Sequence, residues 1–137
     1  MANPLTLYLP IKQDPMSQEV AKLAVTNFSL VAAGLDATKI VHDGRLIAIP
    51  NPPGTEGIQA LLLITVFDGA MNPYLQTFWG PQLQAAFKNL MQISLTPAVS
   101  DDFAGFEKWI NDNNLPVDLY TAYPWTVKQI QDKFQNA

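Results

Sequence analysis

The chain has 137 residues, which is the size of one domain with its own hydrophobic core. Apolar residues make up 48% and charged residues only 15%, below the quarter or so that is typical of soluble domains. So few charges predict exposed apolar surface, which a homodimer or higher oligomer would cover. The net charge of −4 argues against nucleic acid or an anionic membrane as a partner.

The chain contains no cysteine and a single histidine. A disulfide framework and thiolate chemistry are therefore excluded, and no multi-histidine metal site is expected. Residues 1–4 lack the basic stretch and long apolar run of a signal peptide, and the longest uninterrupted apolar run, residues 60–64, is far shorter than a membrane span. We expect a cytoplasmic protein that makes no membrane contact.

Alternation of strand-forming residues predicts a first strand over residues 5–11. Ser17 is a suitable N-cap for the helix that follows, whose apolar residues recur at helical spacing until Gly34 ends it. The second predicted strand spans residues 40–49 and is largely apolar on both faces. The Asn-Pro-Pro-Gly turn within residues 51–57 predicts a hairpin-like connection to the next strand.

The third predicted strand, residues 58–67, is almost entirely apolar, which predicts a central strand covered on both faces. Asn72 and Pro73 read as the N-cap and first residue of a helix. Gly80-Pro81 should separate this helix from a second helical segment, because proline cannot donate the helical hydrogen bond and crowds the preceding turn. A further helix is predicted over residues 102–111.

The last predicted strand covers residues 119–123, and a capping box from Thr126 to Gln129 predicts a short C-terminal helix. The order β-α-β-β-α-α-β-α predicts one α+β domain over residues 1–137 with a ferredoxin-like antiparallel sheet. In that sheet the strands at 58–67 and 5–11 would be the inner ones. The strand at 40–49 would be an edge, whose second apolar face a partner subunit or the C-terminal segments should cover.

Three short motifs resemble, in the same order, a family of uncharacterised bacterial proteins. They are V-H-D-G-R-L-I at 41–47, F-D-G at 67–69 before Y-L at 74–75, and Y-x-x-Y-P at 120–124. The family belongs to the ferredoxin-like, dimeric α/β-barrel group, which includes haem-dependent peroxidases, chlorite dismutases, cofactor-free monooxygenases and proteins with no known activity. The resemblance implies a βαββαβ sheet with extra helices and a homodimer. The chain departs from the family where Asp43-Gly44 replaces Phe-Ala, and where Thr96-Pro97-Ala98 stands in the region of a Gly-Tyr-Pro motif.

His42 is a candidate axial ligand of haem iron or a candidate general base. The alternative is a structural histidine that forms a hydrogen bond to a neighbouring loop. Strict alternation places Arg45 on the opposite face of the strand, unless Gly44 marks a bulge. Arg45 shares a face with Asp43, so it is either a ligand-binding group or part of a salt bridge or dimer contact.

Asp68 is a candidate base or ligand carboxylate at the end of the central strand, or simply part of an Asp-Gly turn. Several aromatic residues are candidates to line an apolar pocket for a small ligand, although aromatic residues at such spacings also build cores. They are Trp79, Trp109, Tyr120 and Tyr123.

The chain lacks a phosphate-binding glycine loop, a G-x-S-x-G elbow, an H-E-x-x-H motif and an EF-hand loop, so nucleotide-driven chemistry and zinc hydrolysis are not expected. Three hypotheses remain open. The chain is a binding or structural dimer, a metal-free enzyme that acts on an apolar substrate through His42 or Asp68, or a haem protein with His42 as axial ligand. In each case with a site, we expect it near His42, between the sheet and its cover, with an aromatic wall.

Overall fold

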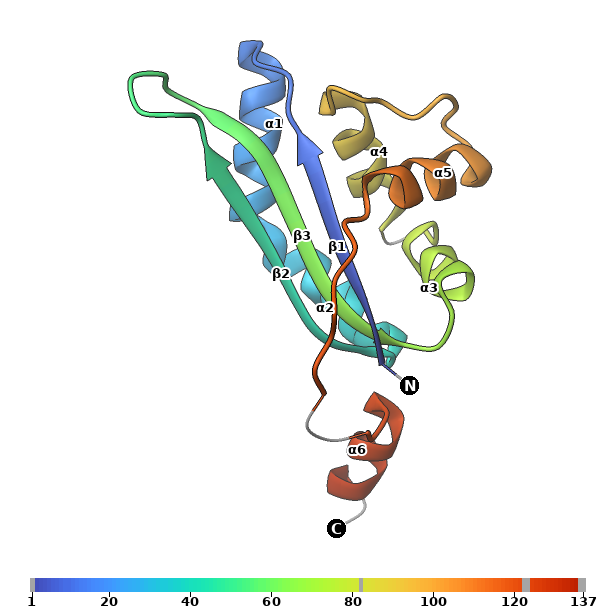
Figure 1. Ribbon diagram of the computed structural model, residues 1–137. Coiled ribbons are helices and arrows are strands. Elements are labelled where there is room, and N and C mark those ends of the chain that lie inside the picture. The colour runs from blue at the N-terminus through green and yellow to red at the C-terminus, as the bar shows by residue number, and fades with distance from the viewer. Residues whose placement is uncertain (1, 82, 122–123, 136–137) are drawn as a thin grey trace.

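The computed structural model describes residues 2–81, 83–121 and 124–135, and within them the chain forms an α+β structure with a three-stranded antiparallel sheet and six helices (Figure 1). In chain order the elements are β1 (Ala2–Pro10), α1 (Pro15–Thr26), α2 (Phe28–Thr38), β2 (Val41–Pro50), β3 (Ile58–Asp68), α3 (Met71–Phe78), α4 (Gln84–Ile93), α5 (Phe103–Asn113) and α6 (Val127–Gln135).

The sheet has the order β1-β3-β2, so the apolar β3 lies in the centre as predicted. Leu63 is paired with Leu7 of β1 on one side and with Leu46 of β2 on the other. On this face of the sheet, β1 and β3 bury alternate residues, as the two-residue period of a strand requires. The predicted hairpin connection between β2 and β3 is confirmed.

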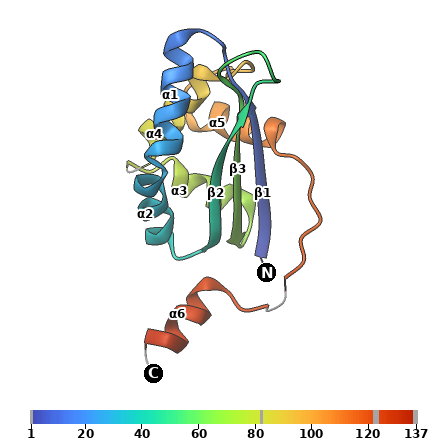
Figure 2. The ribbon, with the colours of Figure 1, turned by 90° about the vertical axis from the view of Figure 1, so that its left-hand side faces the viewer.

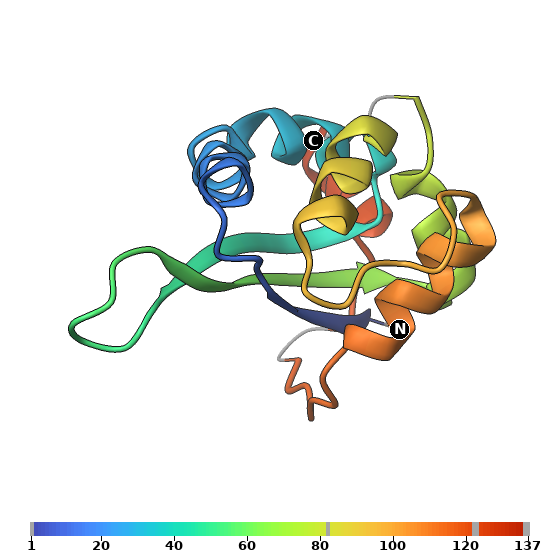
Figure 3. The same ribbon diagram turned by 90° about the horizontal axis from the view of Figure 1, so that it is seen from above.

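Helices α1, α2 and α4 lie on this face of the sheet (Figure 3). Aromatic side chains of β3, α3, α4 and α5 fill the space beneath the helices, with Phe67 stacked on Tyr74 at 3.9 Å between ring centroids. The other face of the sheet is half-buried along β1 and β3 and carries exposed residues on β2. The segment after α5 runs on that side, and its residues 115–121 are exposed (Figures 2 and 3).

The prediction of a strand over residues 119–123 is not confirmed. Leu119, Tyr120 and Thr121 form no strand, and residues 122–123 lie outside the described residues. Among the described residues β1 therefore pairs with β3 alone along its length and is an edge strand, so the prediction that it is an inner strand was wrong.

The chemistry of β1 explains why its outer edge takes no fourth strand. Leu115 N–H donates to the Thr6 carbonyl at 2.8 Å and Thr6 N–H donates to Asn114 Oδ1 at 2.9 Å, which shows that the even-numbered residues of β1 direct their backbone outward. Two of those even-numbered residues are Pro4 and Pro10, which have no N–H to donate. Because Thr6 is already bound by residues 114 and 115, a partner strand would find both an N–H and a C=O group only at Ala2 and Tyr8.

The predicted helix after β1 differs from the observed one at both ends. Asp14, not Ser17, is the N-cap of α1, and its Oδ2 accepts a hydrogen bond from Ser17 N–H at 3.0 Å. The helix breaks at Asn27 and continues as α2 past Gly34, so the prediction that Gly34 ends it was wrong. Gly34 permits a close contact instead, because a Cβ at this position would lie 2.8 Å from Leu83 Cδ2.

Two local predictions in the C-terminal half are confirmed. Helix α3 ends at Phe78 and α4 begins at Gln84, so Gly80-Pro81 separates two helices. The capping box of α6 is formed in both directions: Thr126 N–H donates to Gln129 Oε1 at 2.9 Å, and Gln129 N–H donates to Thr126 Oγ1 at 3.1 Å.

None of the described helices is by itself long and apolar enough to cross a lipid bilayer. Helices α1 and α2 reach the required length and composition only when taken together, and they are bent by 55° relative to one another.

Candidate functional site

The structure brings His42 and Asp68 together where β2 begins and β3 ends. Val41 is paired with Phe67 and Asp43 with Val66, so His42 is the extra residue of a β-bulge. His42 Nε2 lies 2.8 Å from Asp68 Oδ1, and the two side chains are 20% and 11% exposed. The bulge occurs at His42 itself, whereas the sequence suggested a bulge at Gly44, two residues further along the strand.

The second carboxylate oxygen of Asp68 holds the C-terminal helix. Asp68 Oδ2 accepts a hydrogen bond from Val127 N–H, the first residue of α6, at 2.7 Å. The N-terminus of a helix has unpaired N–H groups that favour a carboxylate in this position, so α6 helps to orient Asp68. Sequence reasoning missed this contact because 59 residues separate its partners.

This arrangement fixes what His42 is able to do. An ionised carboxylate only accepts hydrogen bonds, so with neutral His42 the Nε2 atom carries the proton that Asp68 accepts. The Nδ1 atom of the same ring then has a free lone pair and is able to accept a proton from a bound molecule. A carboxylate that orients a histidine in this way is a recurrent arrangement for a general base.

A small hollow lies beside His42, between α2 and the first residues of β2. Its volume is about 160 Å³. It is lined by Phe28, Ala32, Leu35, Asp36, Val41, His42, Asp43 and Gly44.

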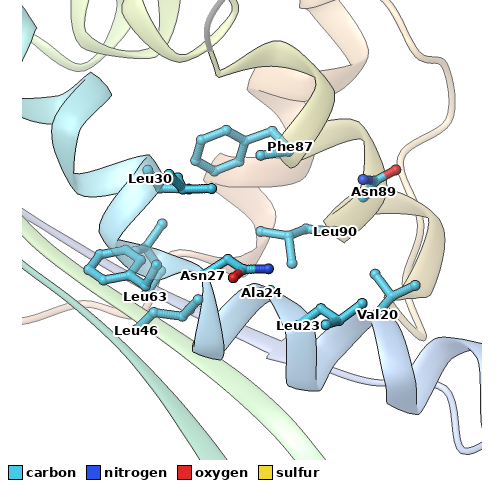
Figure 4. Close-up of a pocket in the computed structure, with 13 residues that line it drawn as sticks. Val20, Leu23, Ala24, Asn27, Leu30, Leu46, Leu63, Phe87, Asn89 and Leu90 are labelled. Carbon is cyan, nitrogen blue, oxygen red and sulfur yellow. The ribbon is translucent and has the colours of Figure 1, made fainter.

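A larger, apolar pocket lies between α1, α2 and α4 above the sheet (Figure 4). Its volume is about 370 Å³. The aliphatic side chains of Leu23, Leu46 and Leu90 reach it from α1, β2 and α4, and Asn27 and Asn89 are its two polar side chains. Phe28 lines both this pocket and the hollow beside His42, so one side chain borders both spaces.

The sequence carried only an indirect signal for this pocket. Helical spacing of Val20, Leu23 and Ala24 indicated a core-facing helix but not a space beneath it. On α4 the small Ala86 and the polar Asn89 face the pocket, where a closely packed helix contact would carry larger apolar side chains.

The structure does not bring the other predicted ligand-binding residues to either space. Trp79 stacks on Phe106 at 4.6 Å between ring centroids. Arg45 Nε lies 3.9 Å from Asp43 Oδ2, and its side chain is 63% exposed. Tyr120 is 88% exposed, and Tyr123 lies outside the described residues.

Trp109 lines a third hollow of about 250 Å³ between α5 and residues 96–99. Its side chain is buried, and its Nε1 atom has no hydrogen-bond partner among the described residues. Trp79, Trp109 and Tyr120 therefore form no aromatic wall near His42, because they lie in the core or on the surface elsewhere. Phe28 is the aromatic residue that borders the hollow beside His42.

The residues around His42 do not fit haem. A proximal histidine needs a free ring nitrogen and space for a macrocycle. The Nδ1 atom of His42 meets the first need, but the adjacent hollow holds only about 160 Å³, which is too small for a macrocycle. Within the described ranges no group of three histidine, aspartate or glutamate side chains lies close enough to hold a metal ion. Comparisons with protein-family models, curated proteins and solved structures found no match to this chain.

Proposed function

We propose that this chain binds a small, uncharged, apolar molecule in the pocket between α1, α2 and α4. The observation that carries the proposal is the pocket itself. Its volume of about 370 Å³ falls within the roughly 300–1,000 Å³ of small-molecule sites, and such sites are apolar with a few polar groups.

The lining defines the class of ligand. Among the described residues it contains no charged side chain, so an ionised ligand would lose hydration without gaining a counter-charge. The amides of Asn27 and Asn89 offer both donors and acceptors at the rim. A neutral molecule with an apolar body and one hydrogen-bonding group, such as a ketone or a hydroxyl, matches this arrangement.

The neutral fluorescent dye N-phenyl-1-naphthylamine tests this proposal, because its emission rises when it enters an apolar site. Ala86→Phe fills the pocket from α4, and we expect it to weaken dye binding by at least about tenfold, since that corresponds to only about 1.4 kcal/mol of binding free energy. Ala85→Phe is the matched control, because Ala85 is exposed on the same helix and does not line the pocket. The proposal fails if the parent protein does not bind the dye, or if A86F binds as well as A85F.

A second candidate function is proton abstraction by His42 from an apolar substrate with an acidic O–H or C–H bond. The 2.8 Å contact between His42 and Asp68 favours it, as does the position of Phe28 between the two spaces. With 4-nitrophenol at a pH just below its own pKa, the parent protein should raise the fraction of the coloured anion. His42→Gln should abolish that rise in a protein of unchanged circular dichroism, and an equal rise in both proteins would contradict the role.

The proposal also includes a fold type and an oligomeric state. A ferredoxin-like unit of the dimeric α/β-barrel type is supported by the position of β3 between β1 and β2 and by the helical connection from β1 to β2. A homodimer is supported by the low content of charged residues and by the exposed Ile47 on the face of the sheet away from α1 and α2. A cytoplasmic location stays a prediction from the sequence.

A further inference from the structure

The two edges of the sheet, formed by β1 and β2, differ in how well they are protected from pairing with a strand of another chain. Exposed sheet edges invite pairing with other chains, and proteins usually block them with proline, charge or a covering segment. On β1 the outward positions include Pro4 and Pro10, and residues 114–115 occupy Thr6. The outer edge of β2 carries Asp43, Arg45 and, at its end, Pro50, but no segment in the described part of the chain covers it, and Figure 2 looks directly onto it.

Backbone hydrogen bonds show which residues of β2 direct their N–H and C=O groups away from β3. Asp68 N–H donates to the Ile40 carbonyl at 2.8 Å, and Asn51 N–H donates to the Gly57 carbonyl at 3.0 Å. Both bonds lie beyond the register shifts of β2, so the phase between them follows from β3. Ile11 N–H donates to the Gln59 carbonyl, which shows that odd-numbered residues of β3 direct their backbone to β1 and even-numbered ones to β2. Ile64 is opposite Arg45, so the odd-numbered residues from Asp43 to Ile49 pair with β3. Gly44 and Leu46, with Ala48, therefore direct their N–H and C=O groups to the open edge.

Neither the backbone conformation nor a close contact within one copy of the chain requires a glycine at position 44. Its backbone lies outside the left-handed region, and an added Cβ would make only ordinary contacts, the nearest at 3.4 Å to Leu35 Cδ1. A glycine inside a strand weakens it and often marks a place where another backbone approaches closely. A glycine at this position leaves room for a second backbone to approach the open edge.

The charges of β2 are arranged to match a second copy. Asp43 and Arg45 flank Gly44, are the charged residues of the strand apart from any charge on His42, and have side chains that are 59% and 63% exposed. In an antiparallel pair centred on Gly44 and its counterpart, Asp43 lies opposite Arg45 of the second copy, and the reverse contact repeats by symmetry. Opposite charges at facing positions stabilise an antiparallel pair.

The shape of the same edge is also complementary to itself. With Gly44 at the twofold axis, Leu46 of the second copy faces the bulged start of β2 at residues 41–42, with its side chain on the helix-covered face. The hollow of about 160 Å³ beside His42 is on that face. Next to the edge, α2 exposes Ala32, a small side chain that allows a second copy to approach, together with Asp36.

From these observations we infer that the outer edge of β2 is the surface on which two copies of this chain associate, antiparallel and centred on Gly44. The two sheets of three strands become one continuous sheet. The inference rests on the proposed homodimer and places its interface at this strand edge, not on the open face of the sheet that carries Ile47.

A cysteine pair tests the register directly, because the natural chain has no cysteine. In the proposed register positions 43 and 45 face one another as a non-hydrogen-bonded pair with Cα atoms about 4.5 Å apart, within the roughly 4.4–6.8 Å that a disulfide spans. Identical positions are about 8 Å apart, too far for a disulfide. In a glutathione redox buffer, a mixture of D43C and R45C should form disulfide-linked dimers, and either variant alone should not.

Charge exchange provides the second measurement, by sedimentation equilibrium. D43R brings two arginine side chains to face one another, and R45D brings two aspartates, so we expect each to weaken dimerisation by about tenfold or more. The double variant D43R/R45D restores opposite charges and should recover the parent affinity.

The outcomes separate the interface from the homodimer itself. A parent protein that is a strict monomer at tens of micromolar overturns both. A parent dimer that neither charge reversal weakens, or a mixture of D43C and R45C that does not cross-link, overturns the β2 interface and leaves a dimer that uses another surface. Dye binding at the pocket between α1, α2 and α4 reports on the ligand proposal separately.

Discussion

A buried hydrogen bond between two hydroxyl groups lies in the middle of the core. The Tyr74 hydroxyl donates to Thr65 Oγ1 at 2.6 Å, and both residues have no exposed surface. Burial raises the pKa of the Tyr74 hydroxyl, and the Thr65 hydroxyl partly opposes that rise. Tyr74 is therefore uncharged at neutral pH, so this contact is an ordinary hydrogen bond between uncharged groups.

Removing one hydroxyl should cost more than removing both. Tyr74→Phe leaves the Thr65 hydroxyl without its partner, and Thr65→Val leaves the Tyr74 hydroxyl without one, so each should lower the free energy of unfolding by about 1–3 kcal/mol. In the double variant two apolar groups of nearly the same shape meet, and such a replacement is close to neutral. We expect the double variant to be more stable than either single variant, with an interaction free energy of about 1–3 kcal/mol.

Urea unfolding of the four proteins at neutral pH measures these differences, with unchanged m-values as the control for a comparable unfolded state. Each kilocalorie per mole should also move the melting temperature by about 2–6 °C for a domain of this size. Single-variant losses that simply add in the double variant would refute the reasoning, because they would show that neither hydroxyl depends on the other.

Three further predictions concern helix ends. Gly105→Ala should lower the free energy of unfolding, because a Cβ there would clash with the Ser100 carbonyl oxygen. The overpacking cost of about 1–3 kcal/mol exceeds the gain of about 1 kcal/mol in helix propensity. A raised melting temperature would contradict this prediction. Hydrogen bonds from Gly105 N–H and from the Ser100 hydroxyl hold the pKa of Asp102 below its usual value. The stabilisation that Asp102 provides is therefore present above its pKa in the unfolded chain and is lost as the pH falls through its lower pKa in the folded protein. Asp102→Asn keeps a helix cap that does not titrate, so this variant should lose less stability than the parent between about pH 5 and pH 2. Asp68→Ala removes the acceptor of Val127 N–H, so hydrogen exchange should quicken in α6 but not in β3, and unchanged exchange in α6 would refute the role of Asp68 as its anchor.

The sequence predicted the elements whose signal is local. The apolar run of β3, the proline break after α3 and the capping box of α6 each involve residues within a few positions of one another, and all three are confirmed. The ends of α1 and α2 were not predicted, because Gly34 has the composition of a helix end but is required by contact with Leu83, far away in the chain. Local propensity yields to such tertiary contacts.

The candidate site was predicted in its parts but not in its arrangement. His42 and Asp68 were each identified by residue type, yet their contact depends on a bulge that shifts the register of β2 against β3. Such a shift is a property of the pairing and has no signature within a single strand. The pocket was not predicted either, since a helix face beside a cavity has the same apolar spacing as one that packs fully.

Asp68 has two partners with separate consequences. One carboxylate oxygen orients His42 and the other holds the first N–H of α6, so loss of the carboxylate removes the tautomer control of a candidate base and the anchor of a helix together. His42→Gln removes the base but leaves Val127 with its acceptor. A change that follows the Asp68 variant alone therefore belongs to the C-terminal segment, and one that follows both belongs to the histidine. Because α6 connects to the domain through the exposed residues 115–121, the position of that helix and the chemistry available to His42 depend on the same carboxylate.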